Sequence, residues 1–203
     1  MKWLAPILPY LAVGFGLFWV HSGWIALLGF HLGILISLFL AKPDLPINLL
    51  FKGNHIRWVI LNLILCGSSG VSLYLLRDSF GIVSDLPAQL QSAGLTRPAW
   101  PLFIAYFVLV NPFVEEYFWR GYLGSPARGL SISDFLYSGF HGLILIGKMY
   151  TVAVIYSLTM LVLVGWFWRQ TVREDGGLLA PVLGHMAADF TILLAVYLMS
   201  NGV

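Results

Sequence analysis

Charged residues are scarce in this sequence. Only 10% of its 203 residues are Asp, Glu, Lys or Arg, whereas 59% are hydrophobic, and soluble domains carry about 25% charged residues. Such a composition excludes a water-soluble globule, because it cannot cover a folded surface with hydrated groups. The 11 basic and 9 acidic residues are scattered, without the block of like charge that binding to nucleic acid uses. We therefore expect no nucleic-acid partner.

Cysteine is almost absent. The single Cys66 cannot form an internal disulfide or a multi-thiolate metal site. The H-E-x-x-H pattern of one class of zinc protease is missing, and so is the GxGD pattern of intramembrane aspartyl proteases. We therefore expect no cofactor and no metal site of these types, and a metal bound by one glutamate and two histidines is the alternative that stays open.

Long apolar runs fill most of the chain. A hydrocarbon core about 30 Å thick needs roughly 20 apolar residues per helix. The sequence therefore predicts an all-α, polytopic membrane helical bundle with about seven transmembrane helices. They lie at residues 3–20, 22–41, 58–76, 99–123, 132–147, 149–168 and 178–199. The fifth run is short, so six or eight helices remain open at this point.

The runs are expected to form a single membrane domain over residues 1–203. Residues 1–98 supply N-terminal helices and an exposed loop at 77–98, and residues 99–203 form a core made by the later helices. If the N-terminus lies on one side, that side receives eight Lys and Arg residues and the other side receives three. Basic residues favour cytoplasmic loops, so the sequence predicts a cytoplasmic N-terminus.

Ionisable residues lie within the spans of the second half, where a charge costs at least about 2.5 to 3.5 kcal/mol. A helix rises 1.5 Å per residue, which places Glu116 and His185 about 10 Å and His141 about 13 Å from the same membrane surface. We therefore expect the ionisable residues to share one polar layer inside the bundle. They are Glu115, Glu116 and Arg120 in the fourth span, His141 in the fifth, and His185 and Asp189 in the seventh.

The spacing of these residues predicts which side chains meet. Glu116 and Arg120 are four residues apart with the acid first, the favourable order for an ion pair on one helix face. Glu115 points about 100° away and should stay outside that pair. His185 and Asp189 are also four residues apart, so the carboxylate can orient the imidazole.

A carboxylate beside imidazoles in a site of low dielectric is suited to activating water. The carboxylate takes a proton, an imidazole positions the water, and nearby donors stabilise the oxyanion that develops. Asn111-Pro112 precedes the two glutamates and predicts a kink or a restart of the helix, because proline removes a backbone hydrogen bond. Pro181 either acts in the same way below His185 or lies in the first turn of its helix.

Three motifs on separate apolar segments resemble those of the CPBP family of intramembrane glutamic endopeptidases, which includes the Ras-converting type of CAAX prenyl endopeptidase. E-E-x-x-x-R matches residues 115–120, F-x-x-x-H matches 137–141, and H-x-x-x-N/D matches 185–189. The resemblance covers about residues 100–194. Two departures are Tyr137 in place of phenylalanine and Asp189 where the prenyl-protein proteases tend to have asparagine.

The resemblance implies a role for each matched residue. Glu115 would be the general base for water, assisted by His141, and His185 with Asp189 would form the oxyanion side. The supporting pair would be Glu116 and Arg120. An ionised aspartate cannot donate a hydrogen bond, so Asp189 must be protonated or must act by orienting His185. The implied activity is hydrolysis of a peptide bond in a membrane-associated peptide or protein. The short chain and Asp189 favour a member in the inner membrane of a prokaryote, without a prenylated client.

A second interpretation is a rhomboid-like serine protease. Residues 67–70 have the G-x-S-G form of the rhomboid nucleophile, so Ser69 would pair with His141 or His185. Four small residues in a membrane helix more often mark close helix packing, and this mechanism leaves the glutamates unused.

A third interpretation assigns no catalysis. The buried charges would relay protons in a transporter, or fix the structure of an immunity protein or scaffold. The remaining histidines are expected at the membrane interface or in helix packing; they are His21, His31 and His55.

Overall fold

The computed structural model describes residues 2–202, and it confirms the all-α membrane bundle. Helices account for 77% of the structure, and the described residues contain no strand. Six helical stretches are long and apolar enough to cross a membrane. They are Lys2–Trp19, Gly23–Ala41, Ile56–Leu75, Trp100–Tyr122, Thr151–Asp175 and Leu179–Asn201.

Two of these stretches, Lys2–Trp19 and Trp100–Tyr122, consist of more than one helix, and short helices lie between the stretches. In chain order the helices are η1 (Lys2–Leu4), α1 (Ile7–Gly14), η2 (Phe15–Trp19), α2 (Gly23–Ala41), η3 (Ile47–Phe51), α3 (Ile56–Leu75), α4 (Arg77–Phe80), α5 (Leu86–Ser92), α6 (Trp100–Leu109), α7 (Asn111–Glu116), η4 (Tyr117–Tyr122), α8 (Ile132–Leu145), α9 (Thr151–Asp175) and α10 (Leu179–Asn201).

The fifth predicted span is α8, which has only 14 residues. At 1.5 Å per residue it is about 21 Å long, shorter than a usual transmembrane helix. It nevertheless runs between the two ends of the bundle. Asp134 in its first turn binds Arg169 near the end of α9, whereas Lys148 beyond its last turn accepts a backbone hydrogen bond from Val83, between α4 and α5. Six long helices and this short one therefore make seven crossings of the bundle.

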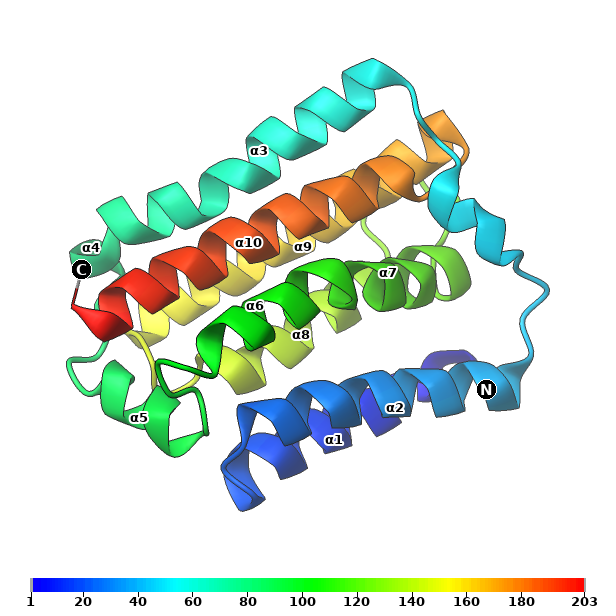
Figure 1. Cartoon of the computed structure of the whole chain (residues 1–203). Helices are drawn as coiled ribbons and strands as arrows, with labels where there is room; N and C mark the ends of the chain where they lie inside the picture. The colour runs from blue at the N-terminus through cyan, green and yellow to red at the C-terminus, as the bar shows by residue number, and fades with distance from the viewer. Residues whose placement is uncertain (1, 203) are drawn as a thin grey trace.

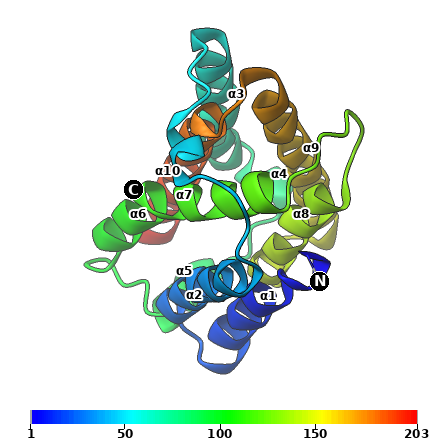
Figure 2. The same ribbon diagram turned by 90° about the vertical axis from the view of Figure 1, so that its right-hand side faces the viewer.

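The helices pack mainly as neighbouring pairs. α1 lies along α2, α8 along α9, and α3 along α10. The broken fourth span, α6 and α7, runs between α10 and the α1–α2 pair (Figure 1). The end-on view shows α7 surrounded by the other helices (Figure 2). The glutamate-bearing helix is therefore central in the bundle.

The closest helix contact joins α3 and α10. A Cβ atom built on Gly70 would lie 2.0 Å from the backbone carbon and oxygen of Thr191, so only glycine permits this approach. A Cβ atom on Gly67 would lie at an ordinary 3.6 Å from the Cβ of Ala187. The small residues at 67–70 therefore serve helix packing, as in other membrane helix pairs.

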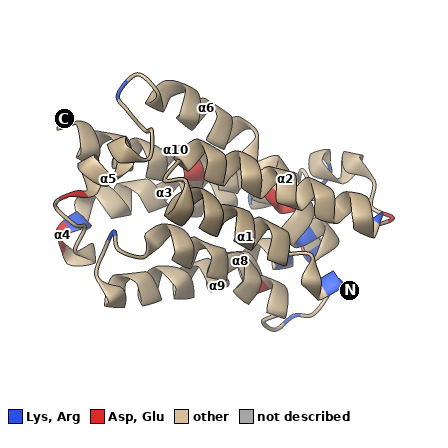
Figure 3. Ribbon diagram, turned by 90° about the horizontal axis from the view of Figure 1, so that it is seen from below, with Lys and Arg blue, Asp and Glu red and all other residues tan. Residues whose placement is uncertain are grey.

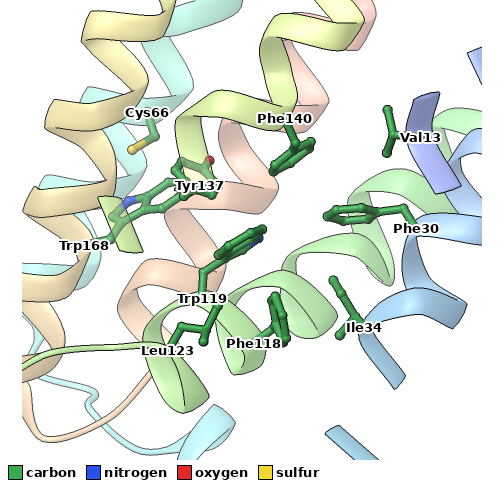
Figure 4. Close-up of a cluster of buried hydrophobic side chains, with 10 residues drawn as sticks. All are labelled: Val13, Phe30, Ile34, Cys66, Phe118, Trp119, Leu123, Tyr137, Phe140 and Trp168. Carbon is green, nitrogen blue, oxygen red and sulfur yellow. The ribbon is translucent and has the colours of Figure 1, made fainter. Parts of the chain in front are cut away.

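An aromatic cluster occupies the centre of the bundle (Figure 4). The rings of Trp119 and Phe140 stack almost parallel, with centroids 5.9 Å apart. Tyr137 and Trp168 complete the side of this cluster nearest α9 and α10. These rigid side chains hold η4, α8 and α9 against one another, and the polar residues described below lie beside them.

The basic residues lie mainly at the ends of the bundle, and more of them lie at the end that carries the N-terminus (Figure 3). Arg169, by contrast, is buried, and both of its terminal nitrogens are engaged. It forms an ion pair of 2.8 Å with Asp134 and donates to the carbonyls of Ser125, Ala127 and Gly129. This cluster fastens the loop between η4 and α8, and so sets where α8 begins.

Candidate active site

The fourth span is interrupted where Asn111-Pro112 predicts it. α6 ends at Leu109 and α7 begins at Asn111, with Val110 between them. Pro112 has no N–H for the carbonyl four residues earlier. After Glu116 the helix continues as η4, a π-helix, a form often found at functional sites. Pro181 does not interrupt its helix, because it lies in the first turn of α10.

Glu116 is the centre of a buried ion cluster. Its side chain is fully buried, and its Oε1 accepts hydrogen bonds from Arg120 Nη1 at 3.1 Å and from His185 Nδ1 at 2.8 Å. The pair with Arg120 confirms the prediction from spacing. The contact with His185 was not predicted, and it joins the fourth span to α10.

Aromatic rings cover the guanidinium of Arg120. Its Cζ lies 3.8 Å from the ring centroid of Tyr137 and 4.7 Å from that of Trp168. A cation held over ring faces away from water gains electrostatic stabilisation. The cluster thus compensates the guanidinium with one carboxylate and two rings.

Glu115 is also buried, at 2% exposure, but it has no ion pair with Arg120, as its helix position predicts. Its Oε2 accepts a hydrogen bond of 3.1 Å from Trp119 Nε1, a partner that the sequence analysis missed. Its Oε1 makes no hydrogen bond with any residue from 2 to 202. Glu116 Oε2 also has no hydrogen-bond partner among residues 2–202, so the two glutamates differ in their cations: Glu116 pairs with Arg120 and His185, and Glu115 does not.

His141 lies on α8 and is partly buried, between aromatic rings. Its centroid is 4.0 Å from that of Phe140 and 5.0 Å from that of Tyr137. Its Nδ1 is 3.0 Å from the Tyr137 carbonyl oxygen. A carbonyl only accepts, so Nδ1 carries the proton in this contact. The neutral ring then has a lone pair on Nε2, which can accept a hydrogen bond from water.

His185 and Asp189 share one face of α10, as predicted. His185 Nε2 lies 3.5 Å from Asp189 Oδ1, while Trp168 stacks on the imidazole at 4.8 Å. The two nitrogens of His185 thus face two carboxylates, those of Glu116 and Asp189. At 3.5 Å the contact with Asp189 is longer than a usual hydrogen bond, so His185 Nε2 is only weakly bound to Asp189 and can form a hydrogen bond with another group.

Tyr137 brings the two histidines into one site. Its ring centroid is 5.0 Å from His141 and 6.3 Å from His185, and its ring also contacts the Arg120 guanidinium. The imidazoles of α8 and α10 therefore lie around one aromatic ring, which also covers the guanidinium paired with Glu116 on α7.

Three further polar residues reach the site, and the sequence analysis did not assign them to it. Asn111 Nδ2 donates to Asp189 Oδ2 at 3.3 Å. The Oδ1 of Asn111 is 2.9 Å from His31 Nε2, and His31 Nδ1 is 3.1 Å from the Tyr106 hydroxyl. Asn111 precedes Glu115 by four residues, so both lie on one helix face, and this spacing could have indicated that Asn111 belongs to the site. His31 is a lone histidine in an apolar run, and no spacing in the sequence indicates its contact with Asn111.

Ser69 is not part of this cluster. It is partly buried on α3, and within residues 2–202 it makes no hydrogen bond to His141 or His185. The rhomboid-like interpretation therefore lacks the serine–histidine contact that activates the nucleophile. Likewise, the part of the chain that the structure describes holds no group of three or more His, Cys, Asp or Glu side chains arranged for a metal ion.

Comparison with known proteins gives one match. Residues 97–191 match the family model described as "Type II CAAX prenyl endopeptidase Rce1-like". The matched segment contains all three motifs, which confirms the family predicted from them. Searches of the curated proteins and of the solved structures each returned no match.

Proposed function

The chain belongs to the CPBP/CAAX protease family, and from this premise we propose that it is an intramembrane endopeptidase in which Glu115 activates water. The family supports a CAAX-type peptide hydrolase acting in a bilayer. The roles of the individual residues below are our proposal.

The different surroundings of the two glutamates support this proposal most strongly. Glu116 is committed to Arg120 and His185, so it is poorly placed to take a proton from water. Glu115 is equally buried, accepts a hydrogen bond only at Oε2 among the described residues, and pairs with no cation there, so its charge is not already committed to Arg120 or His185. A general base needs an accessible lone pair near the water that it deprotonates.

In the proposed reaction His141 accepts a hydrogen bond from water at Nε2 while Glu115 Oε1 takes a proton from the same water. The water oxygen attacks the carbonyl carbon of the peptide bond, and the carbonyl oxygen becomes an oxyanion. His185 acts as an imidazolium, with Nδ1 donating to Glu116, and it donates to this oxyanion from Nε2. Glu115 then returns its proton to the nitrogen that leaves, which yields a carboxylic acid and an amine without a covalent intermediate.

Asp189 accepts hydrogen bonds in this scheme. Its Oδ2 accepts from Asn111 Nδ2, and its Oδ1 faces His185 Nε2. Of the two roles that the motif left open, these contacts favour orientation of His185 over donation to the oxyanion. At 3.5 Å the Nε2–H of the His185 imidazolium is not held tightly by Asp189, so it is available to a developing negative charge.

We further propose that hydrolysis takes place in the cytoplasmic half of a prokaryotic inner membrane. His185 is six residues from the start of α10, about 9 Å along the helix, at the end of the bundle to which Lys2 and Lys52 belong. The excess of basic residues at that end favours the cytoplasm. A membrane-associated peptide would therefore enter from that side.

The test uses the whole protein in liposomes with internally quenched apolar peptides, some ending in a farnesylated CAAX sequence. We expect Glu115→Gln and His141→Ala to lower kcat by about 10² to 10⁴. Glu174→Gln is the matched control, because this exposed glutamate pairs only with its neighbour Arg173.

Other outcomes support other functions. Activity that survives Glu115→Gln but is lost in Ser69→Ala would contradict the glutamate mechanism and favour a serine nucleophile. Loss of a pH gradient across the liposomes without cleavage of any peptide would favour a transporter.

A further inference from the structure

We propose that His31 is a positioning residue, which acts through Asn111 to orient Asp189 at the active site. This inference rests on the proposed function. His31 lies on α2, outside the matched segment 97–191, and no motif includes it. It is 4% exposed, so it contacts protein and not water.

The path from His31 to the site consists of three consecutive contacts between side chains on four helices. Tyr106 on α6 meets His31 Nδ1 at 3.1 Å, His31 Nε2 meets Asn111 Oδ1 at 2.9 Å, and Asn111 Nδ2 meets Asp189 Oδ2 at 3.3 Å. Asp189 then faces His185 on the same helix. The first half of the chain thus reaches the catalytic core through polar contacts and not only through packing.

Donors and acceptors along this path fit one consistent pattern. An ionised Asp189 only accepts, so Asn111 must present its amide N–H to it and its carbonyl to His31. A carbonyl also only accepts, so His31 must carry its proton on Nε2. Nδ1 then accepts from the Tyr106 hydroxyl. His31 in this neutral form is the group that selects the orientation of the Asn111 amide.

Loss of His31 would remove that selection. The Asn111 amide can rotate by half a turn at little steric cost, because its oxygen and NH₂ group are similar in size. After rotation its carbonyl would face the Asp189 carboxylate, and two acceptors would repel each other. Asp189 would then turn away, and His185 would lose the carboxylate that faces its Nε2 while keeping Glu116 at its Nδ1. Binding of substrate does not involve His31, so the effect should fall on kcat.

The kinetic test compares His31→Leu with His31→Gln in liposomes, on a quenched peptide from the set above that the wild-type protein cleaves. Glutamine also has one N–H donor and one carbonyl acceptor, so it can replace both contacts. We expect His31→Leu to lower kcat about 10-fold, as for one lost hydrogen bond to a charged group, with KM nearly unchanged. His31→Gln should recover most of this kcat. In a double-mutant cycle, His31→Leu should have little further effect once Asp189→Ala is present.

A spectroscopic test needs no activity. In protein labelled with ¹⁵N at its five histidines, His31 should appear as the neutral form protonated at Nε2. His31→Leu and Asn111→Leu should each shift the His185 signals, and His21→Gln, at an exposed position outside the path, should not.

The two tests separate failure of this inference from failure of the proposed function. The role of His31 is refuted if His31→Leu keeps the wild-type kcat while Glu115→Gln is inactive. It is also refuted if His31→Gln is as slow as His31→Leu. In both cases the proposed protease function is unaffected. If the wild-type protein cleaves no peptide, the proposed function fails. The histidine spectra then decide alone whether His31 is coupled to His185: unchanged His185 signals in His31→Leu would overturn the coupling.

Discussion

Glu116 is the residue whose charge we expect to matter most for stability. Its fully buried carboxylate is the only one that contacts Arg120 among residues 2–202. At 3.1 Å and an effective dielectric constant of about 20, one such ion pair has a Coulomb energy of about 5 kcal/mol. Removing one partner of a buried pair typically costs about 3 to 5 kcal/mol, because the other charge stays buried without compensation.

Glu116→Gln removes the negative charge and keeps the side-chain volume and an acceptor oxygen for His185. We therefore expect it to lower the free energy of unfolding by about 3 to 5 kcal/mol. The double variant with Arg120→Met removes both charges and should regain most of that loss. Glu174→Gln breaks a partly exposed pair and should cost less than about 1 kcal/mol.

The assay is reversible unfolding of the protein in mixed micelles as the fraction of denaturing detergent increases. The quantity compared is the free energy of unfolding of the two single variants and the double variant. A loss in Glu116→Gln no larger than in Glu174→Gln would refute the argument, and so would a double variant as unstable as the sum of its two single changes.

Two further predictions concern packing and pH. Gly70→Ala should destabilise the protein by about 1 to 3 kcal/mol, because the new Cβ would lie 2.0 Å from the backbone of Thr191. Gly67→Ala should be tolerated, because its Cβ would lie 3.6 Å from the Cβ of Ala187. Equal unfolding midpoints for the two variants would contradict this prediction. Lys148 lies outside the long spans, and burial lowers its pKa. The charged form of Lys148 therefore lowers the free energy of unfolding at neutral pH, and this effect is lost as the pH rises past the ordinary lysine pKa of 10.5. Lys148→Met should therefore stabilise the protein at pH 7 and stabilise it less as the pH approaches 10.5. A gain in stability that does not change with pH would contradict this prediction.

Much of the fold could be predicted because a membrane protein must form helices long enough for the bilayer. The apolar runs locate all six long helices, and the fifth run locates α8. The proline at 112 locates the interruption before α7, because a missing backbone N–H has a local effect that does not depend on neighbours. Polar spacing within one helix also predicts the contacts of Glu116 with Arg120 and of His185 with Asp189.

Contacts between helices could not be predicted in the same way. In a soluble protein the apolar face of a helix indicates which side is buried. In these helices both the lipid-facing and the packed sides are apolar, so the pattern does not indicate how each helix is rotated. The pairing of Glu116 with His185, the hydrogen bond from Trp119 to Glu115, and the path from His31 through Asn111 all depend on that rotation.

The sequence by itself determined that the chain is a helical membrane protein, which residues are charged inside the spans, and which of them share a helix face. These properties follow from hydropathy and from the 3.6-residue repeat of a single helix. Only the tertiary structure decided which glutamate is paired with Arg120 and His185 and which has no cation beside it among residues 2–202. Adjacent residues in one helix differ by a rotation of about 100°, and the packing of the neighbouring helices determines what each of them meets.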